Sequence, residues 1–222
     1  MDLAASLSVL GGLGAIGASL RWNWWRLPKQ GIPVLMYHRI GRPPSLSKQK
    51  SLWVSTKRFD WQMGYLQEHG YTSVNFADIA KGNYPDKSVM ITFDDGYMNQ
   101  YAEAFPVLKR RQMTGVFYIV SEAIGKDNFW HNPEEEPRLP TVGLDQIKEM
   151  LASGMEMGSH AMTHRRLAAI SSDEAKKEIA ESKVRLEKLL GAPMLSFAFP
   201  YGHGEDEAGL VEAAFGAGYG WV

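Results

Sequence analysis

The sequence contains no cysteine among its 222 residues. A disulfide framework, a thiolate zinc site and a cysteine nucleophile are therefore all excluded. A surplus of charge is missing as well, because 24 basic residues face 25 acidic ones. Nucleic-acid partners usually require a clustered basic face, so we expect none here. What the chain does have is an apolar fraction of 45%, enough for the core of one large domain.

Charge is also absent from residues 3–20, which are rich in glycine, alanine and leucine. This segment is marginal in length for a membrane span and lacks the basic start of a signal peptide. Tryptophans and arginines follow it, a mixture typical of a membrane interface. We expect residues 1–30 to be a hydrophobic leader (signal, anchor or disordered), which would associate with a membrane through residues 3–25. Residues 31–222 would form the domain, anchored or exported in the cell envelope, with a cytoplasmic domain as the alternative.

Short apolar runs alternate with helical patterns after residue 30. The runs are apolar nearly throughout, as in parallel strands that are buried on both faces. They cover residues 32–38, 71–76, 89–94, 115–120, 155–160, 196–201 and 218–222. Helical patterns cover residues 57–69, 99–111 (interrupted by Pro106), 144–152 and 173–190, the last with a capping box at Ser171 and Glu174 and a stop at Gly191. The alternation predicts an α/β fold, either an open sheet or a barrel.

Two adjacent carboxylates, Asp94 and Asp95, stand where one of these runs ends. Neighbouring residues of a strand point to opposite faces, so both can serve one site only where the chain turns. Gly96 permits such a turn. Strand ends of this kind carry the active sites of barrels and open α/β sheets. One carboxylate could bind a metal while the other acts as a base; the alternative is a solvent-exposed turn.

Two histidines, His160 and His164, follow another apolar run and lie four residues apart. If this turn is helical, both imidazoles lie on one face and can share a zinc ion or a similar metal. Surface or capping histidines are the alternative. A third run ends in Pro200-Tyr201-Gly202, whose backbone N–H groups could stabilise an oxyanion at the same edge. By itself this third segment is equally typical of an ordinary core strand and turn.

Taken together, these motifs resemble those of the polysaccharide deacetylase family, also called carbohydrate esterase family 4 or the NodB-homology domain. Residues 92–96 match the first motif of the family, and residues 200–202 match the third. The histidine pair matches the second motif in spacing, although Ala161 stands where the family usually has Ser or Thr. The opening residues 34–38 look like the branch that acts on exopolysaccharide or peptidoglycan-like glycans. The resemblance extends over residues 32–222.

The resemblance implies a distorted (β/α) barrel and a metal-dependent hydrolase that removes N-acetyl groups from an amino-sugar polymer. By that resemblance, Asp95, His160 and His164 would hold the metal, and Asp94 would be the general base. Water would be the nucleophile, and Tyr201 would offer a backbone N–H to the oxyanion. Zinc is the first choice of metal, with cobalt or nickel as alternatives. A divalent ion suits the reaction because it polarises an amide carbonyl and lowers the pKa of water from ~15.7 towards ~7.

Two departures from the family pattern affect these expectations. Ser196 occupies the position of an arginine that usually orients the base. The family also has a Leu-His motif that protonates the leaving amine, and this sequence reaches Val222 before it. We therefore expect a barrel that is incomplete at its C-terminal end. His38 is the first substitute for the missing acid and His203 the second, although structural roles suit both histidines as well.

Two further functions stay open beside the hydrolysis of N-acetyl groups. The domain could be catalytically impaired and hold a metal and a glycan without turnover. It could also deacetylate a lipid-linked sugar, an idea supported only by the tryptophan-rich leader.

Overall fold

The computed structural model describes residues 31–222 apart from residues 83, 203 and 205–206. The expected leader, residues 1–30, and the second substitute acid, His203, lie outside the described residues. Ile32–Val222 form one compact unit. None of the helices described for this unit is both long and apolar enough to cross a membrane.

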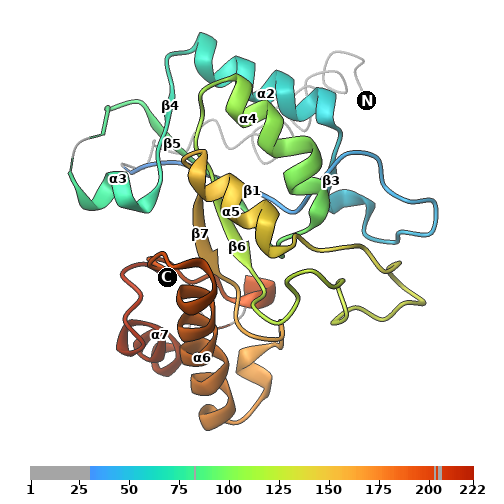
Figure 1. Ribbon diagram of the computed structural model, residues 1–222, viewed down its shortest axis with the longest axis vertical. Helices are drawn as coiled ribbons and strands as arrows, with labels where there is room; N and C mark the ends of the chain where they lie inside the picture. Colours follow the sequence, from blue (N-terminus) through green and yellow to red (C-terminus); the bar gives the residue numbers. More distant parts are fainter. Residues whose placement is uncertain (1–30, 83, 203, 205–206) are drawn as a thin grey trace, which may run out of the picture. The chain divides into compact units, whose positions relative to one another are not determined.

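Parallel strands form the centre of the domain, in the order β1-β5-β6-β7 (Figure 1). Every residue of β5, β6 and β7 is buried, as the continuous apolar runs predict for strands covered on both faces. A short strand, β4, pairs with the start of β5. The strands of this sheet are β1 (Val34–Tyr37), β4 (Thr72–Ser73), β5 (Ser88–Phe93), β6 (Val116–Ile119) and β7 (Glu156–Ser159). The predicted α/β class with a parallel sheet is confirmed.

Beyond β7 the ladder continues only as single bridges, Ser159 to Phe197 and Ser196 to Trp221, both parallel. The prediction of a strand over residues 196–201 is therefore wrong in length, because the chain turns into a 3-10 helix at Pro200–Gly202. Proline cannot donate to a ladder, which ends the pairing there. Among the described residues no pairing leads from Trp221 back to β1.

Helices surround these strands, with α2 beside α4 and α6 beside α7 (Figure 1). The predicted capping box of α6 is present, with the Ser171 side chain accepting from Glu174 N–H, and Gly191 ends the helix at a φ of 63°. Pro106 lies in the first turn of α4, where a missing N–H is tolerated, and a π-helical turn precedes it. The helices are α2 (Thr56–Glu68), α3 (Phe76–Ala80), the π-helical turn Gln100–Ala104, α4 (Phe105–Arg110), α5 (Leu144–Ala152), α6 (Ser172–Leu190) and α7 (Ala208–Gly216).

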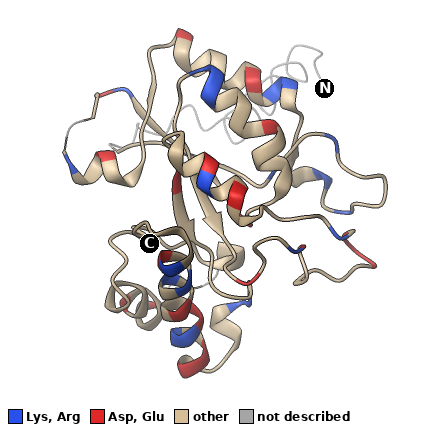
Figure 2. Ribbon diagram, viewed as in Figure 1, with Lys and Arg blue, Asp and Glu red and all other residues tan. Residues whose placement is uncertain are grey.

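Short elements complete the described chain. Strands β2 (Arg39–Ile40) and β3 (Trp53–Val54) pair in parallel, and single 3-10 turns cover Lys50–Leu52 and Leu167–Ala169. Figure 2 shows acidic and basic residues side by side along α5 and α6.

The two faces of the sheet bury different side chains. Phe93 and Phe117 stack at 4.5 Å between ring centroids and belong to the main core under the helices. Met90, Val116 and Tyr118 point to the other face and form a smaller cluster. Both faces are thus filled, and polar residues of the strands can reach open space only at the strand ends. Because all strand pairings of this sheet are parallel, the C-terminal ends of β1, β5 and β7 lie at one edge.

Candidate active site

Polar side chains gather in a cavity of about 450 Å³ at this C-terminal edge. Several of them come from the residues directly after a strand. His38 follows β1, the two aspartates follow β5, and His160 follows β7. The cavity is lined, among others, by His38, Asp94, Asp95, His131, His160, His164 and Tyr201. Of the site residues predicted from the sequence, all that the structure describes are therefore brought together.

Left-handed backbone is concentrated at this cavity. Asp95, Ala161, His164 and Tyr201 all have φ between 62° and 76°, and Gln112, at 54°, is the only other non-glycine residue with a positive φ in the described chain. An L-residue in this region costs roughly 1–2 kcal/mol. Such strain persists only where the surrounding structure enforces it, and it is typical of functional sites. The turn after β5 is left-handed at Asp95 as well as at Gly96, so the glycine alone does not make it.

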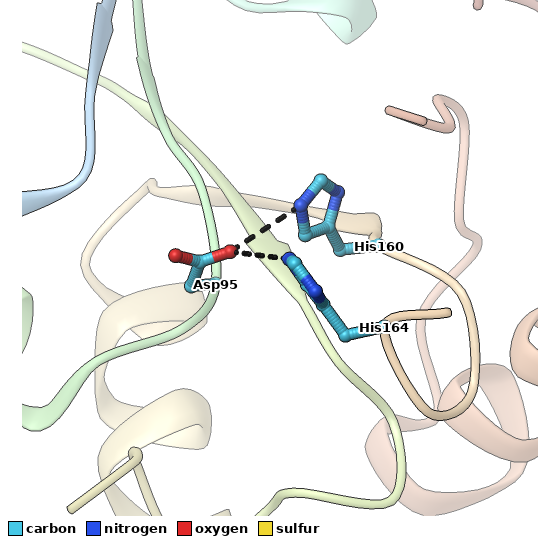
Figure 3. A group of neighbouring side chains, drawn as sticks. All are labelled: Asp95, His160 and His164. Carbon is cyan, nitrogen blue, oxygen red and sulfur yellow. Dashed lines mark hydrogen bonds and ion pairs between the residues drawn. The ribbon is translucent and has the colours of Figure 1, made fainter. Parts of the chain in front are cut away.

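Asp95, His160 and His164 form a compact group of ligand atoms (Figure 3). The Asp95 Oδ1 atom lies 2.9 Å from His164 Nε2 and 3.4 Å from His160 Nε2. All three side chains are buried. The prediction that the two imidazoles converge through a helical turn is wrong. Residues 160–164 form an irregular loop, and the two left-handed residues, Ala161 and His164, turn both rings towards the aspartate.

A hydrogen bond and a stacking contact orient the two imidazoles of this group. The Nδ1–H group of His160 donates to the Ala198 carbonyl at 2.9 Å, which leaves Nε2 as the atom that could bind a cation. The Trp130 ring stacks on His164 with centroids 4.6 Å apart and holds that imidazole in place. One carboxylate oxygen and two imidazole nitrogens are a donor set that suits zinc and related divalent ions. The residues present therefore fit a divalent metal ion.

Burial and the contacts among its members set the protonation states of this group. Burial raises the pKa of Asp95, but hydrogen bonds from His160 and His164 outweigh it and hold the pKa well below its usual value. The pKa of His164 is lowered, mainly by burial. Burial lowers the pKa of His160, but its hydrogen bond to Asp95 and the charges of Asp94 and Asp95 outweigh that effect, so the pKa is raised. A metal cation would bind the ionised Asp95 carboxylate and both imidazoles in their neutral form, so binding would displace a proton from His160.

Asp94 lies beside the group as a second, separate carboxylate. It is buried, and burial raises its pKa above the usual value. The Gln100 side-chain amide donates to the carbonyls of both His38 and Asp94, which fixes the two backbones. His38 Nε2 lies 3.9 Å from Asp94 Oδ2 and is the ion-pair partner that the structure gives this carboxylate. Ser196, at the position of the family's arginine, is fully buried.

The comparisons with known proteins agree with this geometry. The family described as Polysaccharide deacetylase matches residues 81–220, which include both aspartates, both histidines and the Pro-Tyr-Gly turn. The chain belongs to the polysaccharide deacetylase family. The resemblance drawn from its motifs is thereby confirmed.

Curated relatives of the chain come from bacteria. The chain is 30% identical over 193 residues to "Putative polysaccharide deacetylase YxkH" of Bacillus subtilis, covering 85% of this chain and 62% of that protein. It is 27% identical over 210 residues to a "Poly-beta-1,6-N-acetyl-D-glucosamine N-deacetylase" of Staphylococcus aureus, covering 84% of this chain and 70% of that protein. The chain thus spans less than two thirds of the length of YxkH.

Solved structures show the same fold. IcaB from Ammonifex degensii superposes with a TM-score of 0.73 at 28% sequence identity. The superposition covers 87% of this chain and 83% of the IcaB chain. The deacetylase PplD of Streptococcus pyogenes, solved in complex with acetate, superposes with a TM-score of 0.71 at 25% sequence identity. That superposition covers 87% of this chain and 83% of the PplD chain.

Sequence reasoning missed one residue that supports the candidate active site. Glu178 on α6 is buried, and its carboxylate accepts hydrogen bonds from Met162 N–H, Thr163 N–H and the Thr163 hydroxyl at 2.9, 2.9 and 2.5 Å. It thereby holds the loop that carries both histidines. A signal was available, because Glu178 interrupts the apolar stripe of its helix, three residues after Ala175 and one before Ile179.

The segment 129–131 contributes two further side chains to the surroundings of the site. The structure places His131 in the cavity wall and Trp130 against His164. His131 Nε2 lies 3.3 Å from Arg39 Nη2 and 3.2 Å from the Tyr97 hydroxyl. Burial, with the nearby Arg39 charge, lowers the pKa of His131 to about 4. His131 is therefore neutral at neutral pH.

Proposed function

We propose that this chain hydrolyses N-acetyl groups on an amino-sugar polymer. The observation that carries the proposal is the meeting of Asp95, His160 and His164 beside a separate buried carboxylate, Asp94, in one cavity. Family membership supports the reaction class. The name of the Staphylococcus aureus relative supports an N-acetylglucosamine polymer as the substrate.

Asp95, His160 and His164 would hold a divalent ion, with zinc as the first choice and cobalt or nickel as alternatives. When bound, such an ion would polarise the amide carbonyl and make water a better nucleophile. The contribution of the chain is to fix the donor atoms. The hydrogen bond from His160 to Ala198 and the stacking of Trp130 on His164 supply that rigidity.

Asp94 acts as the general base in this proposal and takes the proton of the attacking water. Its raised pKa suits a base, because proton transfer is most efficient when the pKa lies nearer the working pH. Tyr201 offers its backbone N–H to the developing oxyanion from the left-handed turn after Pro200. His38 stands 3.9 Å from Asp94 and returns a proton to the departing sugar amine.

The setting proposed for this reaction is the cell envelope, with the chain anchored or exported through residues 3–25. A polymeric substrate at that place would agree with the exopolysaccharide branch suggested by the opening motif.

Acetate release from N-acetylglucosamine oligomers, measured with added zinc, cobalt or nickel, tests the proposed function. Asp94→Asn keeps the shape of the side chain and removes its basicity. We expect turnover to fall by roughly 10²–10⁴-fold while metal binding is retained. Asp86→Asn, at an exposed position, is the matched control and is expected to leave turnover unchanged.

Three results would contradict the proposal. Full turnover by Asp94→Asn would remove Asp94 from the reaction. A parent chain that binds metal and releases no acetate from soluble oligomers would favour the impaired glycan-binding domain. Turnover confined to lipid-linked sugars would instead favour the third function.

A further inference from the structure

A second cavity, of about 600 Å³, adjoins the candidate active site. The two cavities share His164 and Tyr201 in their walls, so a bound polymer that leaves one would enter the other. Three aromatic rings line the second cavity, and the Phe129 and Trp130 rings meet edge to face at 5.5 Å. The complete lining is Phe129, Trp130, Thr163, His164, Arg165, Arg166, Ala169, Ile170 and Tyr201.

The charge of this lining has one sign. It contains two arginines and no aspartate or glutamate. Arg165 is neutralised, since its Nη1 atom lies 3.1 Å from Glu174 Oε1 outside the lining. Arg166 is exposed and has no carboxylate within ion-pair distance in the part of the chain that the structure describes. Its guanidinium lies 5.0 Å from the centre of the Tyr201 ring, which holds the positive charge at the border between the two cavities.

We propose that this second cavity binds a sugar unit with an anionic substituent, a uronate or a phosphate, next to the N-acetyl sugar being hydrolysed. Arg166 binds the anion, because a guanidinium presents paired N–H donors that match carboxylate and phosphate oxygens. Phe129, Trp130 and Tyr201 supply the apolar walls for the sugar ring. The inference deepens the proposed function and rests on it, since it concerns the polymer on which the same site acts.

The test compares three N-acetylglucosamine oligomers of equal length: a neutral one, one with alternating glucuronate and one with a 6-phosphate. Turnover and equilibrium binding are both measured, and binding is followed by the tryptophan fluorescence of the holoenzyme. We expect kcat/KM and affinity to favour one or both anionic oligomers over the neutral one by roughly fivefold to tenfold at low salt. This preference is expected to shrink as added salt screens the charges.

Arg166→Gln is expected to remove the preference, and Arg166→Lys to keep part of it, because lysine retains the charge and loses the planar pair of donors. Arg58→Gln, exposed on α2, is the control for lost positive charge and should keep the preference. A loss of neutral and anionic turnover in equal proportion would overturn the proposal, because Arg166 would then merely hold Tyr201. An unchanged preference in Arg166→Gln would also overturn it.

Binding separates this inference from the proposed function. If no oligomer is hydrolysed and the anionic ones still bind more tightly through Arg166, the subsite stands and the hydrolytic function fails. If acetate is released equally from all three oligomers, the hydrolytic function stands and the subsite fails. An absence of binding to any of them overturns the subsite.

Discussion

Glu156 is a buried carboxylate at the start of β7 and is not one of the candidate metal ligands. One of its oxygens accepts the Ala77 N–H at 2.9 Å at the beginning of α3. The other, Oε1, is buried and has no hydrogen-bond partner among the residues of known placement. Burial raises the pKa of Glu156, and the hydrogen bond from Ala77 offsets only part of that effect. The charge of this side chain is therefore expected to destabilise the folded domain at neutral pH.

The raised pKa of Glu156 predicts a pH dependence of stability. A group whose pKa is higher in the folded state favours folding at low pH, and this contribution is lost as pH rises through the folded pKa. Glu156→Gln removes the titration and keeps an acceptor for Ala77. The difference in unfolding free energy between variant and parent should therefore shift in favour of the variant from about pH 4 to pH 8. Urea unfolding across this range measures it.

Glu68→Gln, at an exposed position at the end of α2, serves as the control for that experiment. A difference between Glu156→Gln and the parent that does not change with pH would show that the carboxylate carries no such penalty.

At the scale of the element, α6 links its own stability to the geometry of the site. Its N-terminus is fixed by the capping box at Ser171 and its C-terminus by the left-handed Gly191. Between these ends, Glu178 faces the loop that carries His160 and His164 and satisfies two of its backbone N–H groups. A loop with two left-handed residues needs such an external support, because its own backbone makes no helical ladder.

Loss of that support should weaken metal binding. For Glu178→Ala we expect affinity for zinc to fall by roughly 10–100-fold, the range found when partners that orient metal ligands are removed. Glu178→Gln should recover part of the loss, since its amide oxygen still accepts from Met162 and Thr163. Competition with a chromogenic chelator measures the affinity, and circular dichroism checks that α6 remains folded.

Glu181→Ala, one turn further along α6 and exposed, is the matched control. Zinc affinity equal to the parent in Glu178→Ala would show that the loop holds its shape without this carboxylate.

At the scale of the whole domain, a buried ion pair connects segments that are far apart in sequence. Arg39 and Glu136 are separated by 97 positions and meet at 2.7 Å, with both side chains fully buried. The same guanidinium donates to Gln49 and to the Tyr97 hydroxyl, and Ser47 donates to Glu136. This network ties β2 and residues 47–49 to the segment that carries Trp130 and His131.

Breaking this pair on one side should destabilise the domain strongly. Arg39→Met leaves the Glu136 carboxylate buried without its cation, which typically costs about 3–5 kcal/mol of unfolding free energy. The double variant Arg39→Met/Glu136→Leu should regain most of this, because apolar residues can replace a buried pair. Equilibrium urea denaturation of both variants measures the two values.

Arg138→Met is the comparison, since the pair of Arg138 with Asp127 at 3.5 Å is exposed and should contribute less than about 1 kcal/mol. If Arg39→Met lowered the unfolding free energy no more than Arg138→Met does, the network would not hold the two segments together.

The sequence by itself determined the strand and helix order and the kinds of ligand at the site. Continuous apolar runs predicted β5, β6 and β7 because strands buried on both faces have no polar face to display. Local side-chain chemistry predicted both ends of α6. Since the strands are parallel, their C-terminal residues share one edge, and the meeting of Asp95 with His160 and His164 could be expected from order alone.

Only the tertiary structure decided how those ligands are aimed. The left-handed conformation of Ala161, His164 and Tyr201 has no sequence signal, because these residues normally avoid it and are forced into it by their surroundings. Short-range patterns likewise cannot show that Glu178 supports the histidine loop or that Arg166 borders a second cavity. Such contacts join segments whose separation along the chain is long, and they exist only once the strands have brought those segments together.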